Sequence, residues 1–290
     1  MESINIIGAC SDFGVHIDGT KLGPEVLESH IDKTKVNEII NIYAKDINKE
    51  LEKNNKQKNL KLVNEFNSRL YSAVLDTLNS NLFPLTIGGD HSIAIASALA
   101  SIKKHENLGI IWFDAHGDYH TFETTTSGNI HGLPFATITN YKKSILSNFH
   151  SGNYFNPKNA VLVGGRDIDE PFELENLKNA GVTVFSTEDI HKFGTDYIYS
   201  KAFDIASAGT NGVHVSYDLD VIDPKLAPGV SIPAKNGISL EESYDFITHM
   251  IKNKEKVKSF DLVEFNPLLD INDVTQKIAQ QILNYLLNNL

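Results

Sequence analysis

Three polar clusters in this sequence contain side chains that bind metal ions in proteins, and each cluster follows a short apolar run. They are residues 88–92 (GGDHS), 114–118 (DAHGD) and 218–220 (DLD). In extended chain, side chains two residues apart share a face, so the two Asp and the His of DAHGD point the same way. The two Asp of DLD repeat that arrangement. The candidate ligands are His91, Asp114, His116, Asp118, Asp218 and Asp220.

These six side chains predict a site for two divalent cations. Four carboxylates and two imidazoles at one place would repel one another unless cations lay between them. Six ligands with oxygens that can bridge suit two ions better than one. Carboxylate-rich ligation with some imidazole and no sulfur favours Mn²⁺, although ligand type also admits Zn²⁺, Fe²⁺ and Co²⁺. Two ions roughly 3.5–4 Å apart generate a hydroxide nucleophile at neutral pH and stabilise charge on the attacked group.

The elements that must position these clusters are apolar strands alternating with amphipathic helices. Strands are predicted at residues 4–8, 83–87, 108–113, 160–164, 182–185, 213–217 and 257–263, and helices at 63–78, 92–104, 239–252 and 272–287. Such alternation indicates parallel strands joined by crossovers, so we expect an α/β fold, in one domain over residues 1–290. Each cluster alone could be a cap or a turn. Three clusters on separate strands favour one shared site at the carboxyl edge of the sheet.

Composition narrows the class of protein. The 290 residues include 26 Lys and Arg against 37 Asp and Glu, a formal net charge of −11, which argues against a nucleic-acid partner. A single cysteine, Cys10, excludes an intramolecular disulfide and is compatible with a reducing cytosol. The first residues do not resemble a signal peptide, and no stretch approaches the 18 or so apolar residues of a membrane span. We expect a cytoplasmic protein without a membrane partner.

Five segments resemble, in this order, the signature segments of the arginase family of metal-dependent ureohydrolases: GGDHS, DAHGD, TTTSGNIHG, SYDLDVIDP and VEFNP. The resemblance extends from INIIGA near the start to the final helix, and includes VLVGGRDID (161–169) and FSTEDIHKFG (185–194). Within the family, SGNIHG after DAHGD resembles the arginases rather than the agmatinases. The resemblance implies a three-layer α/β/α fold with a mostly parallel sheet. It also implies a homo-oligomer, trimer or hexamer.

The resemblance implies two Mn²⁺ per chain and a small guanidino substrate. One ion would be bound by His91, Asp114, Asp118 and Asp218, and the other by His116, Asp114, Asp218 and Asp220. A hydroxide bridging the ions would attack the guanidinium carbon of L-arginine, giving L-ornithine and urea.

Three residues would have catalytic roles by the same resemblance. Asp118 would move the proton of the nucleophile to the leaving amine. His131 would pass protons to solvent, a role for which an imidazole is suited by its near-neutral pKa. Glu264 would pair with the guanidinium group and orient its carbon.

The far end of the substrate would be bound by residues that the resemblance also assigns. The α-carboxylate would meet Thr125 and Ser127, and the α-amino group would meet Asp169. Three positions depart from the family pattern: His120 replaces an Asn that contacts the α-carboxylate, Phe172 replaces a Glu on the α-amino side, and Ile232 replaces a Thr. His120 remains a candidate substrate contact. Missing polar partners can change substrate discrimination by orders of magnitude.

Three other functions remain open at this point. A related ureohydrolase would act on agmatine, guanidinobutyrate or formiminoglutamate. A single-zinc deacetylase shares the fold and an Asp-x-His plus Asp arrangement, but His91 and the complete DAHGD and DLD clusters argue against it. A catalytically inactive homologue would bind metal or an amino acid as a regulator.

Overall fold

The computed structural model describes residues 3–44, 55–169 and 171–290. Their core is one eight-stranded sheet in the order β2-β1-β3-β8-β7-β4-β5-β6, in which each strand pairing is parallel. The strands are β1 (Ile4–Cys10), β2 (Val36–Tyr43), β3 (Phe83–Gly88), β4 (Gly109–Phe113), β5 (Ala160–Gly165), β6 (Thr183–Ser186), β7 (Val213–Asp218) and β8 (Val257–Val263). The predicted α/β class and parallel sheet are confirmed.

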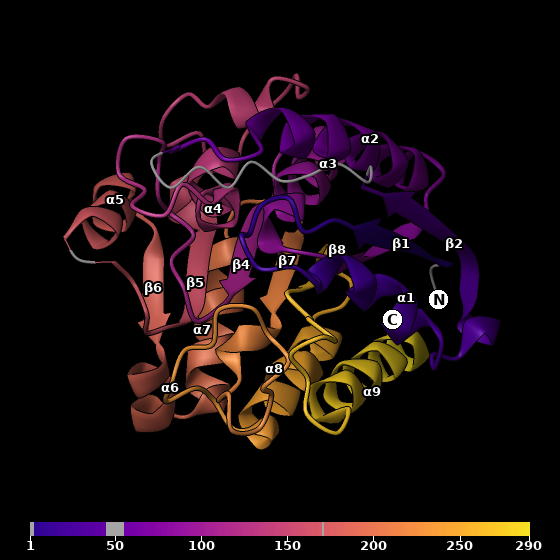
Figure 1. The fold of residues 1–290 in the computed structure, drawn as a ribbon. Coiled ribbons are helices and arrows are strands. Elements are labelled where there is room, and N and C mark those ends of the chain that lie inside the picture. Colours follow the sequence, from indigo (N-terminus) through magenta and orange to yellow (C-terminus); the bar gives the residue numbers. More distant parts are fainter. Residues whose placement is uncertain (1–2, 45–54, 170) are drawn as a thin grey trace.

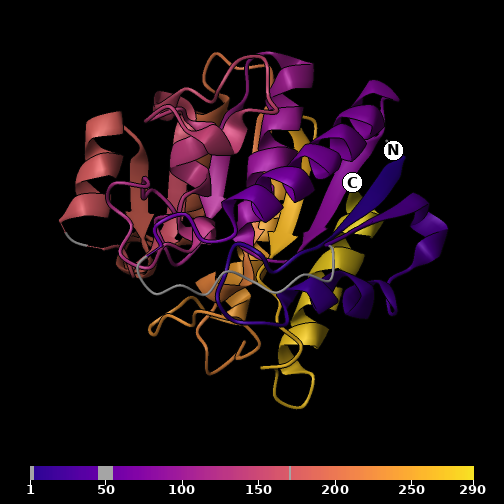
Figure 2. The same ribbon diagram turned by 45° about the horizontal axis from the view of Figure 1, so that its top comes forward.

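Helices cover both faces of this sheet (Figure 1). They are α1 (Gly23–Glu28), α2 (Leu60–Asn79), α3 (Ala94–His105), α4 (Pro134–Ile138), α5 (Phe172–Ala180), α6 (Thr187–Phe193), α7 (Thr195–Ser207), α8 (Leu240–Lys252) and α9 (Val274–Asn289). Helices α2, α3 and α4 pack on one face, and α1, α7, α8 and α9 pack on the other. Figure 2 shows the purple α2–α3 layer and the yellow α9 on opposite sides of the strands.

The strands are apolar throughout because both of their faces are buried. In β4, Ile110 and Trp112 belong to the core under α2 and α3, whereas Ile111 and Phe113 belong to the core under α7 and α8. All four side chains are fully buried. This two-sided burial explains why the predicted strands read as continuous apolar runs rather than as alternating ones.

The sequence prediction missed β2, one of the two edge strands. Its sequence, VNEIINIY, mixes Asn and Glu with apolar residues, and most of its side chains are partly or fully exposed. Strand β2 has one neighbour, β1, and its exposed polar residues interrupt the apolar pattern from which the interior strands were predicted. The helix predicted from residue 92 begins at Ala94, because His91–Ile93 forms a 3-10 turn ahead of it.

Five neighbouring strands end at one edge of the sheet, and the polar clusters follow them. In sheet order, β3 leads into GGDHS, β8 into VEFNP, β7 ends in DLD, β4 leads into DAHGD, and β5 leads into RDID. Parallel strands place all these carboxyl ends side by side, which is where open α/β sheets bind ligands. No helix among the described residues is long and apolar enough to cross a membrane.

Candidate metal centre

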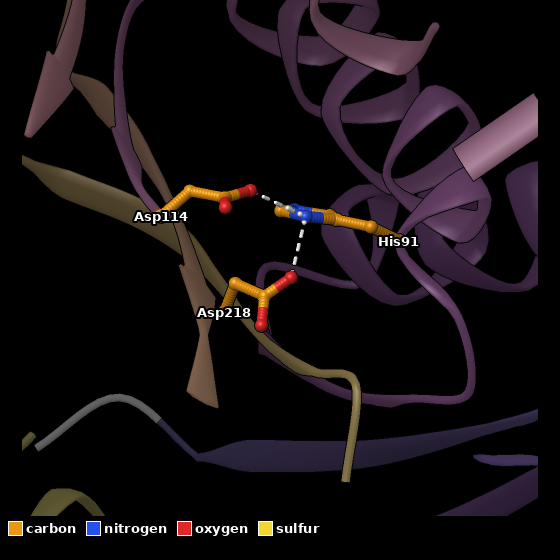
Figure 3. Close-up of side chains that lie close together, drawn as sticks. All are labelled: His91, Asp114 and Asp218. Carbon is orange, nitrogen blue, oxygen red and sulfur yellow. Dashed lines mark ion pairs between the residues drawn. The ribbon is translucent and has the colours of Figure 1, made fainter. Parts of the chain in front are cut away.

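His91 lies at the centre of the first group of predicted ligands. Its Nδ1 atom is 3.0 Å from Asp114 Oδ2, 3.2 Å from Asp118 Oδ2 and 3.1 Å from Asp218 Oδ2. In Figure 3, the carboxylates of Asp114, directly after β4, and Asp218, at the end of the neighbouring β7, both point toward the imidazole of His91, which comes from the turn after β3. All four side chains are buried. The fold therefore brings together four residues from three separate segments.

A second group adjoins the first and shares Asp114 with it. His116 Nδ1 is 2.8 Å from Asp220 Oδ2 and 3.5 Å from Asp114 Oδ1. Asp114 thus presents one carboxylate oxygen to each imidazole. One ligand atom from each of His91, Asp114 and Asp218 lies within 4.8 Å of the others, and the same holds for Asp114, His116 and Asp220. The arrangement offers two adjacent places for a cation, joined by one carboxylate.

The surroundings of His91 fit a bound cation. Its Nε2 atom is 2.8 Å from Ser216 Oγ, and its ring stacks on Trp112 with the centroids 4.0 Å apart. The tautomer with hydrogen on Nε2 satisfies Ser216 and leaves a lone pair on Nδ1. That buried Nδ1 makes no well-directed hydrogen bond to the described residues, although three carboxylate oxygens surround it. A lone pair facing carboxylate oxygens is repulsive unless a cation lies between them.

Three carboxylates of the cluster differ in how strongly they favour ionisation. Burial, together with the charge of Asp114, raises the pKa of Asp118 to about 7. Burial also raises the pKa of Asp218, and the charges of Asp220 and Asp114 add to this effect. Burial opposes ionisation of Asp114 too, but the adjacent imidazoles of His116 and His91 outweigh it and lower its pKa. The cluster therefore retains protons that a cation would displace.

We expect divalent metal to bind more tightly as the pH rises. Although burial favours neutral imidazoles, the neighbouring carboxylates raise the pKa of His91 and His116. Protonated imidazoles stabilise the metal-free protein below about pH 6.5, and this stability is lost as the pH rises through the raised values. Each displaced proton strengthens apparent affinity about tenfold per pH unit. Calorimetric titration with Mn²⁺ at pH 6, 7 and 8 measures this, and a constant or falling affinity would contradict it.

Two of the candidate residues have a left-handed backbone, which is uncommon outside glycine. The φ angle is 49° at Asp118 and 67° at Glu264. Such conformations cost about 1–3 kcal/mol and persist where the surroundings impose them. The Asp118 carbonyl accepts hydrogen bonds from the backbone N–H groups of Phe135 and Ala136, and the Glu264 N–H donates to Gly89. These bonds tie both residues to adjacent loops at the edge of the sheet.

Glu264 lies between the cluster and His131. Its Oε1 accepts a hydrogen bond of 2.8 Å from the His91 backbone N–H and lies 3.1 Å from His131 Nδ1. Burial favours the neutral form of His131, but the Glu264 carboxylate raises the pKa of this imidazole. The second oxygen of Glu264, Oε2, is buried and has no hydrogen-bond partner among the described residues. This oxygen is therefore available to a cationic donor.

The site opens into a cavity of about 280 Å³ at the carboxyl edge of the sheet. It is lined by His16, His116, Asp118, His120, Thr126, Ser127, Asn129, His131, Gly132, Asp167, Asp169, Glu173, Asp218, Asp220, Ile232 and Glu264. This lining includes seven carboxylates, and the described part of the chain contributes no Lys or Arg to it. A cavity with this charge favours a cationic ligand.

Comparison with known proteins identifies the group to which this arrangement belongs. A model described as "Arginase family" matches residues 2–288. The chain belongs to the arginase family. The resemblance seen in the five sequence segments is thereby confirmed, and the protein is an arginase-family ureohydrolase.

Curated relatives and solved structures agree along the full length. An arginase of Bacillus subtilis (strain 168) is 36% identical over 295 residues, covering 99% of this chain and 98% of that one. The crystal structure of arginase from Bacillus subtilis has a TM-score of 0.88 and 34% identity, covering 100% of this chain and 99% of that one. The Entamoeba histolytica arginase, solved in complex with L-ornithine, has a TM-score of 0.90 and 29% identity, with 98% of each chain covered.

In the structure of this arginase-family protein, some of the predicted substrate residues line the cavity and one does not. Ser127, Asp169 and His120 line the cavity. Thr125 does not: it is buried, and its Oγ1 accepts a hydrogen bond from the Gly128 N–H, so it stabilises the turn behind the cavity wall. The neighbouring Thr126 lines the cavity in its place. Ile232, at the departure from the family pattern, also lies in the wall.

Of the two other residues that depart from the family pattern, His120 lines the cavity and Phe172 does not. His120 Nε2 lies 3.1 Å from Asp169 Oδ2, and its Nδ1 lies 3.2 Å from Thr124 Oγ1, so the imidazole contacts the carboxylate predicted to meet the α-amino group. Phe172 is 54% exposed and does not line the cavity, whereas Glu173 does. Glu173, the next residue, therefore contributes to the cavity wall and Phe172 does not.

Several residues of the site were not predicted. Ser216 contacts His91 Nε2, Asn129 and His16 line the cavity, and Nδ2 of Asn129 lies 2.8 Å from His16 Nδ1. Ser216 precedes Asp218 by two residues on one strand face, a spacing that could have indicated it. His16 has no comparable signal, because it reaches the cavity from the loop after β1 through long-range packing.

Proposed function

We propose that this chain is a binuclear manganese hydrolase that converts L-arginine to L-ornithine and urea. The observation that carries the proposal is the pair of ligand groups joined by Asp114, one around His91 and one around His116. Their oxygen and imidazole donors, with no sulfur, suit Mn²⁺. Two Mn²⁺ held there would lower the pKa of a shared water and stabilise negative charge on the attacked group.

The residues around the ions are suited to orient a guanidinium group and to move protons. The unpartnered Oε2 of Glu264 is available to accept a guanidinium N–H, a charge-assisted bond that would set the position of the carbon. Asp118 lies beside His91, 3.2 Å from its Nδ1, where its carboxylate could take a proton and return it to the leaving amine. His131, bonded through Nδ1 to Glu264, lines the cavity and is suited to exchange protons with solvent.

The charge of the cavity supports arginine over substrates that have a carboxylate but no ammonium group. Asp169 and Glu173 line the end of the cavity that also contains His120, and Asp169 could bind an α-ammonium group. Guanidinobutyrate and formiminoglutamate have carboxylates without that ammonium, and would meet the same acidic wall. The Entamoeba histolytica arginase was solved with L-ornithine, the product expected here, which supports the choice of L-arginine as the substrate.

A related ureohydrolase activity is the second candidate, and one contact favours it. Because His120 already contacts Asp169, an α-amino group would have to compete for that carboxylate. Agmatine, which lacks an α-amino and an α-carboxylate group, would not. The single-zinc deacetylase is disfavoured by the second ligand group around His116. Assembly into trimers or hexamers stays a prediction.

The proposed function is tested by urea release after preincubation with Mn²⁺. The panel contains L-arginine, agmatine, guanidinobutyrate and guanidinopropionate, with formiminoglutamate followed by formamide release. We expect L-arginine to have the highest kcat/KM. Preference for agmatine would mean that His120 marks a changed pocket. Inactivity on all five compounds, in protein shown by metal analysis to hold two Mn²⁺, would favour a regulatory role, and one tightly bound Zn²⁺ would favour the deacetylase.

A further inference from the structure

We propose that Glu173 of α5 is a positioning residue for the hydrolysis described above, because it holds the loop that carries Asp118. This inference rests on the proposed function, since it assigns to Asp118 a role at the reacting group. The carboxylate of Glu173 accepts its hydrogen bonds from backbone N–H groups and not from the candidate metal ligands. It acts through the backbone on either side of the cavity.

The carboxylate of Glu173 joins the two loops that form one wall of the cavity. Its Oε1 accepts a hydrogen bond of 2.9 Å from the N–H of Tyr119, in the loop after β4. Its Oε2 accepts one of 3.0 Å from the N–H of Asp169, in the loop after β5. The residue is 4% exposed, so water does not compete freely for these bonds. One buried side chain therefore fixes the spacing between the loops of Asp118 and Asp169.

A second side chain of α5 holds the same residue of the loop. Asn176, three residues after Glu173 and on the same helix face, donates from Nδ2 to the Tyr119 carbonyl at 3.1 Å. Both the N–H and the C=O of Tyr119 are thus bound by α5. Gly117 leaves room for this approach, since an added Cβ there would lie 2.6 Å from Glu173 Cδ and 2.8 Å from its Oε1.

The hydrogen bonds from Glu173 and Asn176 hold Tyr119, which follows a residue with a left-handed backbone. Asp118, directly before Tyr119, has the left-handed φ of 49°. Its carbonyl is bound by Phe135 and Ala136, and the next N–H is the one bound by Glu173, so hydrogen bonds restrain the chain on both sides of Asp118. Without the Glu173 bond, the loop would relax toward ordinary φ values. The Asp118 carboxylate would then leave its place 3.2 Å from His91 Nδ1.

The test compares Glu173→Gln with Glu175→Gln. Glu175 is exposed on the same helix, so its substitution makes the same charge change without touching the loops. Gln at 173 keeps the size but has one acceptor oxygen, so one of the two backbone bonds is lost. We expect kcat to fall about 10- to 100-fold on both L-arginine and agmatine, with a smaller change in KM, because misplacement by about 1 Å can cost that much. Glu175→Gln should match the wild type.

Two further readouts keep the test decisive. Mn²⁺ affinity, measured by calorimetry, should weaken about tenfold in Glu173→Gln but not in Glu175→Gln, whatever the substrate. If Glu173→Gln fails to fold, Asn176→Ser should show the same pattern more weakly, because it releases the Tyr119 carbonyl. If Glu173→Gln folds, or Asn176→Ser in its place, and has the kcat and Mn²⁺ affinity of the wild type, the proposal is overturned.

The outcomes also separate this inference from the proposed function. A loss confined to L-arginine, with agmatine turnover and Mn²⁺ affinity unchanged, would show that Glu173 contacts the substrate's ammonium group instead, and would overturn the positioning role. A wild-type protein that releases urea from none of the guanidino compounds would contradict the proposed function. The Mn²⁺ affinities of the two variants would still decide whether Glu173 holds the metal-binding loop.

Discussion

Asp218→Asn is expected to reduce urea release about a thousandfold or more, because it removes one negative charge from the centre of the ligand cluster. Asp218 lies 3.1 Å from His91 Nδ1 and belongs to the first ligand group. Loss of several kcal/mol of charge stabilisation corresponds to such a change in rate. The amide preserves the bond of 2.8 Å that the side chain accepts from the Asp220 N–H, so the local turn should persist. Steady-state kinetics with saturating Mn²⁺ measure the loss.

The same variant should not destabilise the metal-free protein. The raised pKa of Asp218 means that its proton is bound more tightly in the folded than in the unfolded chain, so stability is lost as the pH rises through the raised value. A neutral asparagine avoids this cost. At pH 8 we expect the Tm without metal to stay the same or rise, and the increase in Tm on adding Mn²⁺ to disappear. Asp204→Asn, an exposed site on α7, is the matched control and should keep the Mn²⁺ effect.

Asp169→Ala is expected to lower kcat/KM for L-arginine about 100-fold while leaving agmatine turnover within about threefold. An ammonium group that loses its charged partner in a binding site forfeits roughly 1.5–3 kcal/mol. Asp169 lines the cavity but is not among the ligand groups, so the metal-dependent chemistry should remain. Parallel kinetics on the two substrates measure this difference, because agmatine has no α-amino group.

A neighbouring carboxylate provides the control for Asp169. Asp167 lies in the same loop, lines the same cavity and is similarly exposed, at 66% against 58% for the Asp169 side chain. If general charge at the cavity mouth were the cause, Asp167→Asn would reduce arginine turnover as much as Asp169→Ala. Unchanged kcat/KM for L-arginine in Asp169→Ala would contradict the arginine assignment and favour a substrate without an α-amino group.

Much of the architecture could be predicted because its signals are local. Interior strands such as β4 are apolar on both faces, and this pattern was visible in the residues alone. The order of strands and helices then implied parallel pairing, and parallel pairing placed the clusters after β3, β4 and β7 at one edge. Strand β2 was not predicted because its partly exposed side chains include Asn and Glu, which interrupt the apolar pattern.

The candidate ligands were also predictable, since the spacing of DAHGD and DLD constrains side-chain direction within a single segment. The residues of these segments therefore predict which side chains gather at the edge of the sheet. They do not determine how each imidazole is oriented. Ser216 and Trp112 orient His91 through contacts across strands, and such contacts depend on register and packing.

The substrate end of the cavity was decided by tertiary structure. Thr125 is buried and accepts a hydrogen bond from Gly128, and His120 contacts Asp169. Glu173 lines the cavity, whereas Phe172 does not. Loop side chains have no fixed periodicity, so a shift of one residue or one rotamer changes which group faces the cavity. The packing of α5 against two loops that are far apart in the sequence places Glu173 in the wall.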